Sequence, residues 1–393
     1  MGEVYRLYFV CSSVSGWLHQ CLSQKSRIIE MNENEYVLMK GNEAIAHAAI
    51  RCGCDGYFGY PITPQSEVLE TLALEKPWET TGMVVLQAES EVAAINMLYG
   101  GGGSGKRVMT SSSSPGVALM QEGISYMCAC EIPAVIVNVQ RGGPGLGTIQ
   151  PGQCDYYQAT VGGGNGDYNV IVLAPNSVQE MADFVEESFR LAFKYRMPVM
   201  MLSDGVIGQM MERVKLPEQK PRRTEAEIYA ECPWAANGIN LKQRKPNTLS
   251  SLESDPLLMD KRNEAMQQKY ALVKQTETRA EAIMCDDAEY LLVGFGCMSR
   301  IAEEAMHQLR EEGYKVGLFR PITLWPFPEQ EIREAAKNAK RILVCEMNAG
   351  QMITDVRMAL ECRVPCEHFG RMGGIVPDPA EVIASAREKL LGL

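Results

Sequence analysis

The fold is decided by two short stretches early in the chain, Gly59-Tyr60-Pro61-Ile62-Thr63-Pro64 and Gln87-Ala88-Glu89-Ser90-Glu91. Each stretch follows a short apolar run that is typical of a strand, and each leads into a helical pattern. Glu91 opens a helix of small and apolar residues, where burying a lone carboxylate is unfavourable unless a partner offsets the cost. An acidic side chain in such a place is a candidate for a functional role.

The first half of the chain alternates strands with helices. Strands are expected at 36–39, 83–87, 107–112, 134–139, 170–173 and 198–202, with helical patterns between them. The run 134–139 is apolar and rich in β-branched residues, as expected for a strand that is buried on both faces of a parallel sheet. This order predicts a doubly wound α/β domain over residues 34–214.

Two local patterns in this domain predict turns and caps. Thr63 is expected to cap a helix that starts at Pro64. Residues 100–106, GGGGSGK, imitate a phosphate-binding loop, but a helix precedes them and a strand follows, whereas such a loop needs the reverse order. Arg107 also replaces the Ser or Thr that would hold magnesium. We therefore expect a helix-to-strand turn there rather than a nucleotide site.

The second half of the chain changes in composition. Residues 215–247 are rich in Pro and charge, and residues 215–286 are expected to form a linker with a long surface helix at 260–283. Residues 287–393 return to the alternating pattern and predict a second α/β domain, in which Ser299 is expected to cap a helix at 301–312. Residues 1–33 show no clear period. We interpret them as an extension upstream of a natural start at Met31, or as an arm that packs on a partner subunit.

Composition excludes several classes of protein. The 393 residues carry a formal net charge of −11, which argues against a nucleic-acid partner and against an anionic membrane surface. No apolar run is long enough to span a bilayer. The 13 cysteines show no spacing typical of a disulfide framework or of an iron–sulfur cluster, so reduced thiols in a cytoplasmic protein are expected.

Three ordered motifs identify a family. They are Tyr60-Pro61-Ile62-Thr63-Pro64, the stretch from Gln87 to Gly100, and Val137-Asn138-Val139-Gln140-Arg141-Gly142-Gly143-Pro144-Gly145. Together they resemble the alpha subunit of 2-oxoacid:ferredoxin oxidoreductases, and the resemblance runs from about residue 36 to the C-terminus. It is strongest to the members that act on 2-ketoisovalerate, which implies a branched-chain substrate and leaves pyruvate and 2-oxoglutarate as alternatives.

The resemblance implies a fold and a role for each motif. Residues 34–214 are expected to be a domain that binds the pyrimidine half of thiamine diphosphate, and residues 287–393 a transketolase C-terminal-like domain. Glu91 is the expected catalytic residue, which hydrogen-bonds the aminopyrimidine ring and activates the cofactor. Thr63 and Arg141 are the expected substrate-binding residues. The cofactor is expected to contact Tyr60, Pro61, Ile62, Glu91 and Gly142.

The chain lacks the motif that holds the diphosphate. Thiamine diphosphate enzymes use a Gly-Asp-Gly motif and a downstream Asn pair for magnesium, whereas Ser203-Asp204-Gly205 lacks the first Gly and has no suitable Asn pair after it. A beta subunit is therefore expected to supply the diphosphate site and Mg²⁺. A gamma subunit and a ferredoxin-like iron–sulfur subunit, or ferredoxin itself, complete the expected complex, with coenzyme A as co-substrate.

Other interpretations are open. Arg141 could be tied to a structural carboxylate, and Glu89 is expected to be a surface or capping group because it lies two positions from Glu91 and points elsewhere. The whole chain could belong to a non-redox thiamine diphosphate enzyme, such as a decarboxylase or a synthase. It could also be a scaffold subunit that has kept the fold without catalysis.

Overall fold

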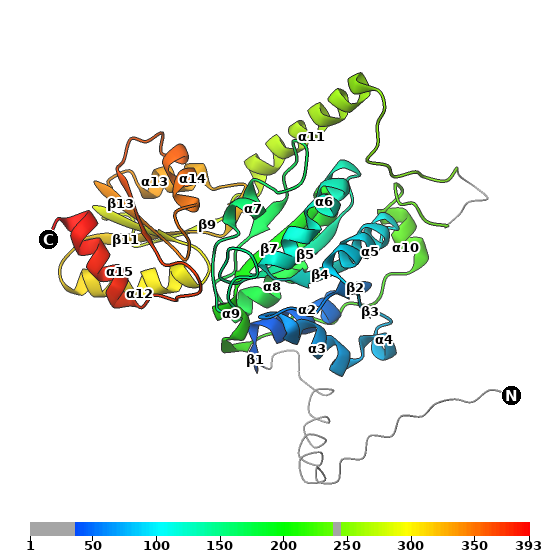
Figure 1. Ribbon diagram of the computed structural model, residues 1–393, viewed down its shortest axis with the longest axis horizontal. Helices are drawn as coiled ribbons and strands as arrows, with labels where there is room; N and C mark the ends of the chain where they lie inside the picture. Colours follow the sequence, from blue (N-terminus) through cyan, green and yellow to red (C-terminus); the bar gives the residue numbers. More distant parts are fainter. Residues whose placement is uncertain (1–35, 239–244) are drawn as a thin grey trace, which may run out of the picture.

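The computed structural model describes residues 36–238 and 245–393 (Figure 1). The N-terminal extension predicted for residues 1–33, and the choice between a start at Met31 and a partner-binding arm, lie outside these described residues. Two sheets form the body of the molecule, and a long helix projects from one side (Figure 1).

The larger sheet has seven strands in the order β12-β6-β7-β5-β4-β2-β3. Six of them pair in parallel: β2 (Gly56–Gly59), β3 (Val84–Gln87), β4 (Val108–Ser112), β5 (Ala134–Gln140), β6 (Ile171–Leu173) and β7 (Pro198–Asp204). Every residue of β5 is buried, because helices cover both faces of the sheet. The predicted doubly wound arrangement is confirmed.

Helices on the two faces belong to connections that run in opposite directions along the sheet. On one face α2 (Gly41–Arg51) packs against α3 (Ser66–Glu75) and α8 (Val178–Tyr195), and on the other α5 (Glu91–Gly103) packs against α6 (Ser114–Ala129). Right-handed crossovers produce this division, because connections in opposite directions must lie on opposite faces. Shorter elements complete the domain: β1 (Val37–Lys40), α4 (Pro77–Thr80), α7 (Tyr156–Thr160), α9 (Gly205–Gln209) and β8 (Met211–Val214), with β1 and β8 paired antiparallel.

The smaller sheet has five strands in the order β14-β13-β10-β11-β9. Four are parallel, namely β10 (Tyr290–Gly294), β11 (Val316–Pro321), β13 (Arg341–Glu346) and β14 (Cys366–Gly370), and β9 (Ala280–Ile283) is antiparallel to β11. Its helices are α12 (Cys297–Glu311), α13 (Glu329–Ala335), α14 (Met352–Ala359) and α15 (Pro379–Ala386), which continues as a π-helical turn over Arg387–Leu391.

The two domains are joined by more than the chain itself. Strand β12 (Thr323–Trp325), from the second half of the sequence, pairs antiparallel with β6 at the edge of the larger sheet. Arg320 is buried at the same junction and forms ion pairs with Glu180 of α8 and Glu281 of β9. These contacts fix the second domain against the first.

The segment between the domains follows the prediction in part. Residues 215–255 contain the short α10 (Glu225–Glu231), and α11 (Pro256–Thr276) is the long surface helix, which buries only Tyr270 and Val273. The predicted continuation of that helix to residue 283 is wrong, because 280–283 form β9. Helix α11 ends where Glu277 turns inward to accept hydrogen bonds from Lys194 and Tyr195 of α8.

Two predicted helix caps are also wrong. Helix α3 begins at Ser66 rather than Pro64, and Thr63 caps nothing, because buried Gln65 occupies the N-cap position. Helix α12 begins at Cys297, and Ser299 lies inside its first turn. A carboxylate from the other domain performs the capping instead: the Cys297 N–H donates to Asp204 Oδ2 over 2.9 Å.

The predicted turn at residues 100–106 is helical in its first half. Helix α5 continues to Gly103, because its glycines allow it to lie very close to the sheet and to the start of β5. A Cβ on Gly102 would stand 2.6 Å from Ile132 Cγ2, and one on Gly101 would stand 2.8 Å from Val108 Cγ1. The glycines therefore serve packing, and the turn itself is confined to the residues after Gly103.

Three further observations concern the described residues alone. Cys362 is the exposed cysteine among them, most of the others are buried, and none of those described forms a disulfide. No described helix combines the length and the apolar character needed to cross a bilayer. Within 36–238 and 245–393, no cluster of three His, Cys, Asp or Glu side chains is placed to hold a metal ion.

Candidate active site

The candidate site lies at the carboxyl ends of neighbouring parallel strands. The connection from β2 runs toward β3, whereas the connection from β4 runs in the opposite direction to β5, so the chain diverges between β2 and β4. Such a switch point is where doubly wound folds place ligands. The loops that follow β2, β3, β4 and β5 all meet at this edge of the sheet, and they carry every residue that the sequence singled out.

Glu91 begins α5, directly after its N-cap. Ser90 caps the helix by accepting a hydrogen bond from the Ala93 N–H, and the Glu91 side chain turns inward, leaving 6% of the residue exposed. It packs on Gly116 of α6, where a Cβ would stand 2.6 Å from Glu91 Oε1 and 2.1 Å from Ser112 Oγ. Among the described residues no side chain or backbone group forms a hydrogen bond or ion pair with this carboxylate. Glu89, in contrast, is exposed.

The loop after β2 is held rigidly from below. Gln65 is fully buried, donates from Nε2 to the Tyr60 carbonyl over 3.3 Å and accepts from Ser111 Oγ over 2.5 Å. Asn42 donates to the Pro64 carbonyl over 2.7 Å. Tyr60, Pro61 and Thr63 are consequently exposed at the tip of the loop, and Ile62 is half-buried. The side chains of Tyr60, Pro61 and Thr63 thus lie at the molecular surface, beyond the carboxyl ends of the strands.

The side chain of Arg141 links the loop after β2 to the loop after β5, to which Arg141 itself belongs. Its Nη1 donates to the Thr63 carbonyl over 2.9 Å, and its Nη2 donates to the Leu146 carbonyl over 2.8 Å. Its Nε is buried and has no partner among the described residues. The structural alternative, in which a carboxylate holds the guanidinium, is not what the structure shows, since both bonds go to backbone carbonyls. Arg141 and Thr63 are therefore in direct contact.

A buried polar cluster that the sequence analysis missed lies beneath Arg141. Asp155 Oδ2 accepts from Ser114 Oγ over 2.5 Å and from Asn138 Nδ2 over 3.0 Å, and Ser114 Oγ accepts from the Arg141 N–H over 3.0 Å. Burial raises the pKa of Asp155 above its ordinary value, although these hydrogen bonds oppose the shift. A signal for the cluster was present, because Asn138 interrupts the apolar run of residues 134–139.

Gly142 lies where the second domain approaches the site. A Cβ on Gly142 would stand 2.6 Å from the Gly373 carbonyl carbon, and Thr148 Oγ1 donates to the Gly373 carbonyl over 3.2 Å. A cavity of about 690 Å³ opens beside this contact. It is lined by the start of α6, the loop after β5 and two loops of the second domain. The sequence predicted Gly142 as a cofactor contact and gave no sign of its contact with the second domain.

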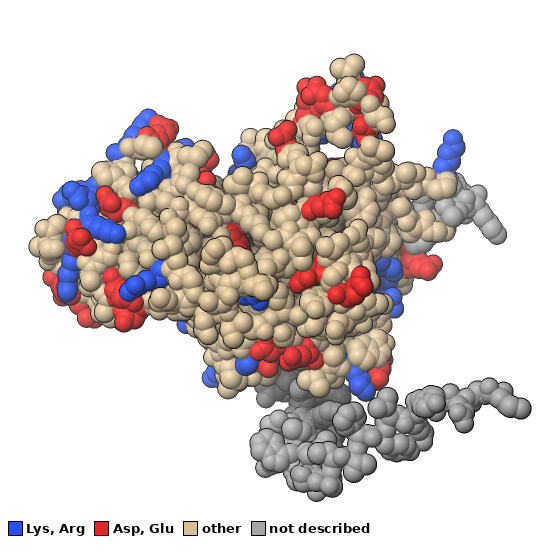
Figure 2. All heavy atoms as spheres, in the orientation of Figure 1, with Lys and Arg blue, Asp and Glu red and all other residues tan. Residues whose placement is uncertain are grey.

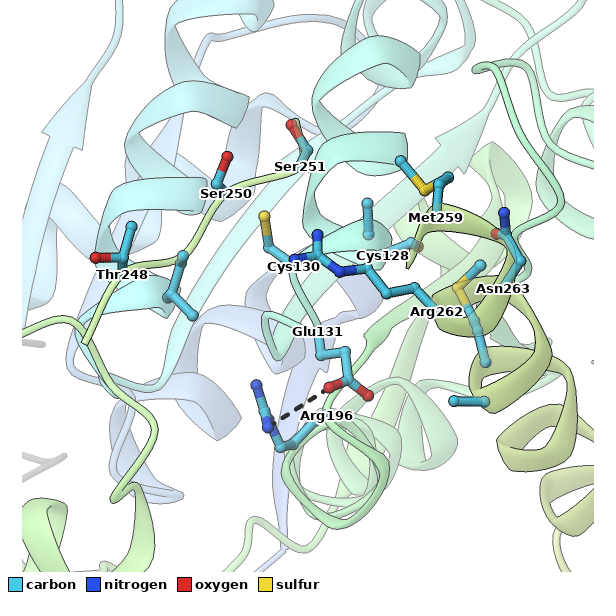
Figure 3. A pocket seen from close by; sticks show the side chains of 14 residues that line it. Cys128, Cys130, Glu131, Arg196, Thr248, Ser250, Ser251, Met259, Arg262 and Asn263 are labelled. Carbon is cyan, nitrogen blue, oxygen red and sulfur yellow. Dashed lines mark ion pairs between the residues drawn. The ribbon is translucent and has the colours of Figure 1, made fainter. Parts of the chain in front are cut away.

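Another cavity lies at the opposite end of the sheet. It measures about 480 Å³ and is enclosed by the end of α6, Arg196 at the end of α8, residues 248–251 and the first half of α11 (Figure 3). Arg262 points into it near Cys130, and Glu131 pairs with Arg196 at its base (Figure 3). None of the residues that the sequence singled out lines this cavity, so it is separate from the candidate site.

The fold and family comparisons together define a class. Residues 47–281 match the family model described as pyruvate flavodoxin/ferredoxin oxidoreductase, thiamine diphosphate-binding, and residues 288–382 match that of pyruvate:ferredoxin oxidoreductase core domain II. A split-gene transketolase has the same fold, with a TM-score of 0.57 at 13% identity over 90% of this chain and 98% of that one. The chain is thus an α/β protein of the thiamine diphosphate-dependent class.

Closer relatives specify the family. The ketoisovalerate oxidoreductase subunit VorB of Methanothermobacter marburgensis is 46% identical over 89% of this chain and 97% of its own length. The structure of a 2-oxoglutarate:ferredoxin oxidoreductase from Magnetococcus marinus superposes with a TM-score of 0.78 at 27% identity, over 90% of this chain and 65% of that chain. The chain belongs to the 2-oxoacid:ferredoxin oxidoreductases, oxidoreductases that act on 2-oxo acids, and is a subunit of such a hetero-oligomer.

Proposed function

We propose that this chain is the alpha subunit of a complex that converts a branched-chain 2-oxo acid and coenzyme A to acyl-CoA and carbon dioxide and reduces ferredoxin. The observation that carries the proposal is Glu91, a buried carboxylate without a partner among the described residues, at the switch point of a sheet in this family. A carboxylate buried in this way is unfavourable unless a ligand pairs with it.

The surroundings of Glu91 suit the aminopyrimidine ring of thiamine diphosphate. The carboxylate is free to form a hydrogen bond, and it lies so close to Gly116 that a Cβ there would stand 2.6 Å from Glu91 Oε1. Exposed Tyr60, Pro61 and half-buried Ile62 offer apolar surface on the neighbouring loop. Gly142 is the proposed contact from the loop after β5. When bound, the cofactor supplies a nucleophilic carbon and an electron sink.

Each residue of this chain then has a defined task. Glu91 holds a proton between its carboxylate and the ring nitrogen. The Arg141 guanidinium binds the carboxylate of the 2-oxo acid, for which charge-assisted hydrogen bonds in a parallel pair are the strongest arrangement. Thr63, exposed next to Arg141, contacts the substrate through its hydroxyl group. The backbone carbonyls that now hold Arg141 keep its side chain extended toward the loop after β2.

The remaining parts of the enzyme come from partners. Asp204, the acidic residue of Ser203-Asp204-Gly205, is fully engaged as a cap for α9 and α12, so it does not serve a magnesium ion here. A beta subunit supplies the diphosphate site and Mg²⁺. A gamma subunit and a ferredoxin-like iron–sulfur subunit, or ferredoxin, complete the cytoplasmic complex and carry the electrons.

The surface next to Glu91 suits the beta subunit. Helices α5 and α6 contain two acidic residues and no basic residue. The acidic residues are Glu91, which is buried, and Glu122, which is exposed. They expose Val92, Met97, Leu119 and Tyr126. Figure 2 shows that the central surface in front of these helices is mostly uncharged, whereas charged side chains gather over the second domain. Apolar surface around a site that a second subunit has to complete is typical of a permanent subunit interface.

A branched-chain substrate is favoured over 2-oxoglutarate by the loop after β5. From Arg141 to Asp155 this loop has one cation, Arg141 itself, and it exposes Leu146 and Ile149. A substrate with a second carboxylate would need a second cation. The VorB relative is named for ketoisovalerate, which is a branched-chain 2-oxo acid.

The test is an anaerobic ferredoxin-reduction assay on the complex assembled with its partner subunits. We expect reduction to require both thiamine diphosphate and coenzyme A and to be fastest with 3-methyl-2-oxobutanoate, compared with pyruvate and 2-oxoglutarate. Glu91→Gln should abolish turnover while the subunits still co-purify, because the amide keeps the shape of the side chain but cannot share a proton with the ring nitrogen of the cofactor. Turnover by this variant would remove Glu91 from the mechanism, and an intact complex that does not reduce ferredoxin would favour a non-redox enzyme or a scaffold.

A further inference from the structure

The main chain of Arg141 is held by a segment ten residues further along the chain, Pro151–Asp155. Pro151 forms a β-bridge with Arg141, and a Cβ on Gly152 would stand 2.9 Å from the Arg141 carbonyl oxygen. Cys154 Sγ donates to that oxygen over 3.3 Å. Asp155 reaches the Arg141 N–H through Ser114, as described above. The position of Arg141 therefore depends on where this segment lies.

The segment is in turn held by the second domain, mainly through Gln153. The Gln153 Nε2 donates to the Phe295 carbonyl over 2.8 Å, and its Oε1 accepts from the Met347 N–H over 3.2 Å. Its backbone N–H donates to the Met347 carbonyl over 3.2 Å, and its backbone carbonyl accepts from Asn348 Nδ2 over 2.8 Å. Each of its main hydrogen-bonding groups thus bonds to the turn after β10 or the turn after β13.

Gln153 is not accessible to water, so water cannot replace its hydrogen-bond partners. The residue is fully buried, and its second amide hydrogen points to Asp204 Oδ2, which lies 3.4 Å from Nε2 and caps α12 of the second domain. Gln351 adds a separate tie, since its Nε2 donates to the Cys154 carbonyl over 2.9 Å. Buried polar networks that are fully satisfied are rigid, so a displacement of the second domain must move the segment with it.

We propose that Gln153 is a positioning residue for substrate binding, through which the second domain fixes Arg141. The inference rests on the proposed function, in which Arg141 binds the substrate carboxylate. Through this contact the second domain then has a role in the affinity for the 2-oxo acid. A displacement of about 1 Å at a binding group costs up to about 100-fold in activity, so a small shift at this contact is large at the site.

The test uses the assembled, cofactor-loaded complex with 3-methyl-2-oxobutanoate. Gln153→Ala should raise KM for the 2-oxo acid by about 10- to 100-fold and change kcat and the KM for coenzyme A much less. A loss of binding that is shared by the ground and transition states has this signature. An unchanged KM for the 2-oxo acid in a folded complex overturns the proposal.

A double-mutant cycle separates a positioning role from general damage. Arg141→Lys alone should raise the same KM, and adding Gln153→Ala to it should have little further effect, because both changes act on one interaction. Independent, multiplying effects overturn the role of Gln153 and leave Arg141 as the substrate anchor. No effect of Arg141→Lys overturns the anchor itself, and with it the substrate-binding part of the proposed function.

Two further variants complete the design. Tyr157→Phe removes an exposed hydrogen bond of 2.7 Å to Thr354 across the same domain contact, without touching the segment, and should leave KM unchanged. Gln351→Ala removes the tie to Cys154 at a half-buried position and should raise KM in the same direction as Gln153→Ala. If Gln153→Ala fails to fold, Gln351→Ala decides: a raised KM supports the proposal, and an unchanged KM overturns it.

Discussion

Gly116→Ala should inactivate the complex through a single methyl group. The added Cβ would stand 2.6 Å from Glu91 Oε1 and 2.1 Å from Ser112 Oγ. Both atoms are buried, and β4 and α6 hold the backbone around them. Because van der Waals contacts between heavy atoms are usually about 3.5 Å or more, the carboxylate has to move by about 1 Å or the helices have to separate.

Both responses have a predictable size. Overpacking a filled interior by one methyl group costs about 1–3 kcal/mol of stability. A shift of about 1 Å at a group that acts on the cofactor lowers turnover by up to about 100-fold. We therefore expect a folded complex with a moderately lower Tm and a kcat reduced by one to two orders of magnitude.

Gly123→Ala is the matched control. Its Cβ would meet Ile95 Cγ1 at 2.6 Å, so it imposes a similar clash between α5 and α6, about two helical turns after Gly116 on α6 and without contact to Glu91. Both variants should lose similar stability by thermal unfolding, but only Gly116→Ala should lose turnover in the anaerobic ferredoxin assay. Equal kcat losses in the two variants would show that the position of Glu91 is not what limits turnover and would refute the reasoning.

Three other changes test separate parts of the structure. Leu119→Asp should prevent co-purification with the beta subunit without changing the Tm of this chain, since Leu119 is 55% exposed on α6; recovery of the full complex would place the interface elsewhere. Gln65→Leu should destabilise the chain by about 1–3 kcal/mol in urea unfolding, because the buried Ser111 hydroxyl loses its acceptor. Burial favours a raised pKa of Glu277, yet hydrogen bonds from Lys194 and Tyr195 lower the pKa below its ordinary value. Its carboxylate therefore stabilises the fold above the unfolded pKa of about 4.3 and loses this effect as the pH falls through the folded pKa. Calorimetry should find a lower Tm for Glu277→Gln than for the wild type at pH 7, and the two should converge below pH 4; a constant gap would contradict the assignment.

Much of the fold could be predicted because its signals are local. The apolar, β-branched run that became β5 and the amphipathic pattern that became α8 each report burial directly in the sequence. The separation of buried Glu91 from exposed Glu89 agrees with a helical start at this point, since residues two apart point to different sides of a helix. The meeting of the motifs could also be predicted, because the carboxyl ends of parallel strands all lie at the same edge of the sheet.

The errors arose where distant residues decide the local structure. Helix α12 starts at Cys297 because Asp204, far away in the sequence, caps it, and no pattern near Ser299 contains that information. Strand β9 looked helical because its composition suits a helix, and only pairing with β11 makes it a strand. Gln153 was not identified for the same reason, as all of its partners outside its own loop lie more than 50 positions away.

Strand β12 has a consequence for how the molecule unfolds. The family models divide the chain between residues 281 and 288, yet Thr323–Trp325 completes the edge of the sheet that begins at β2. A fragment cut at that division would leave the hydrogen-bonding groups of β6 open and remove the partners of Arg320. We therefore expect the two regions to unfold as one cooperative unit, in which loss of the carboxyl-terminal part also melts the amino-terminal part. The boundary between the two family models would then not be a boundary between folding units.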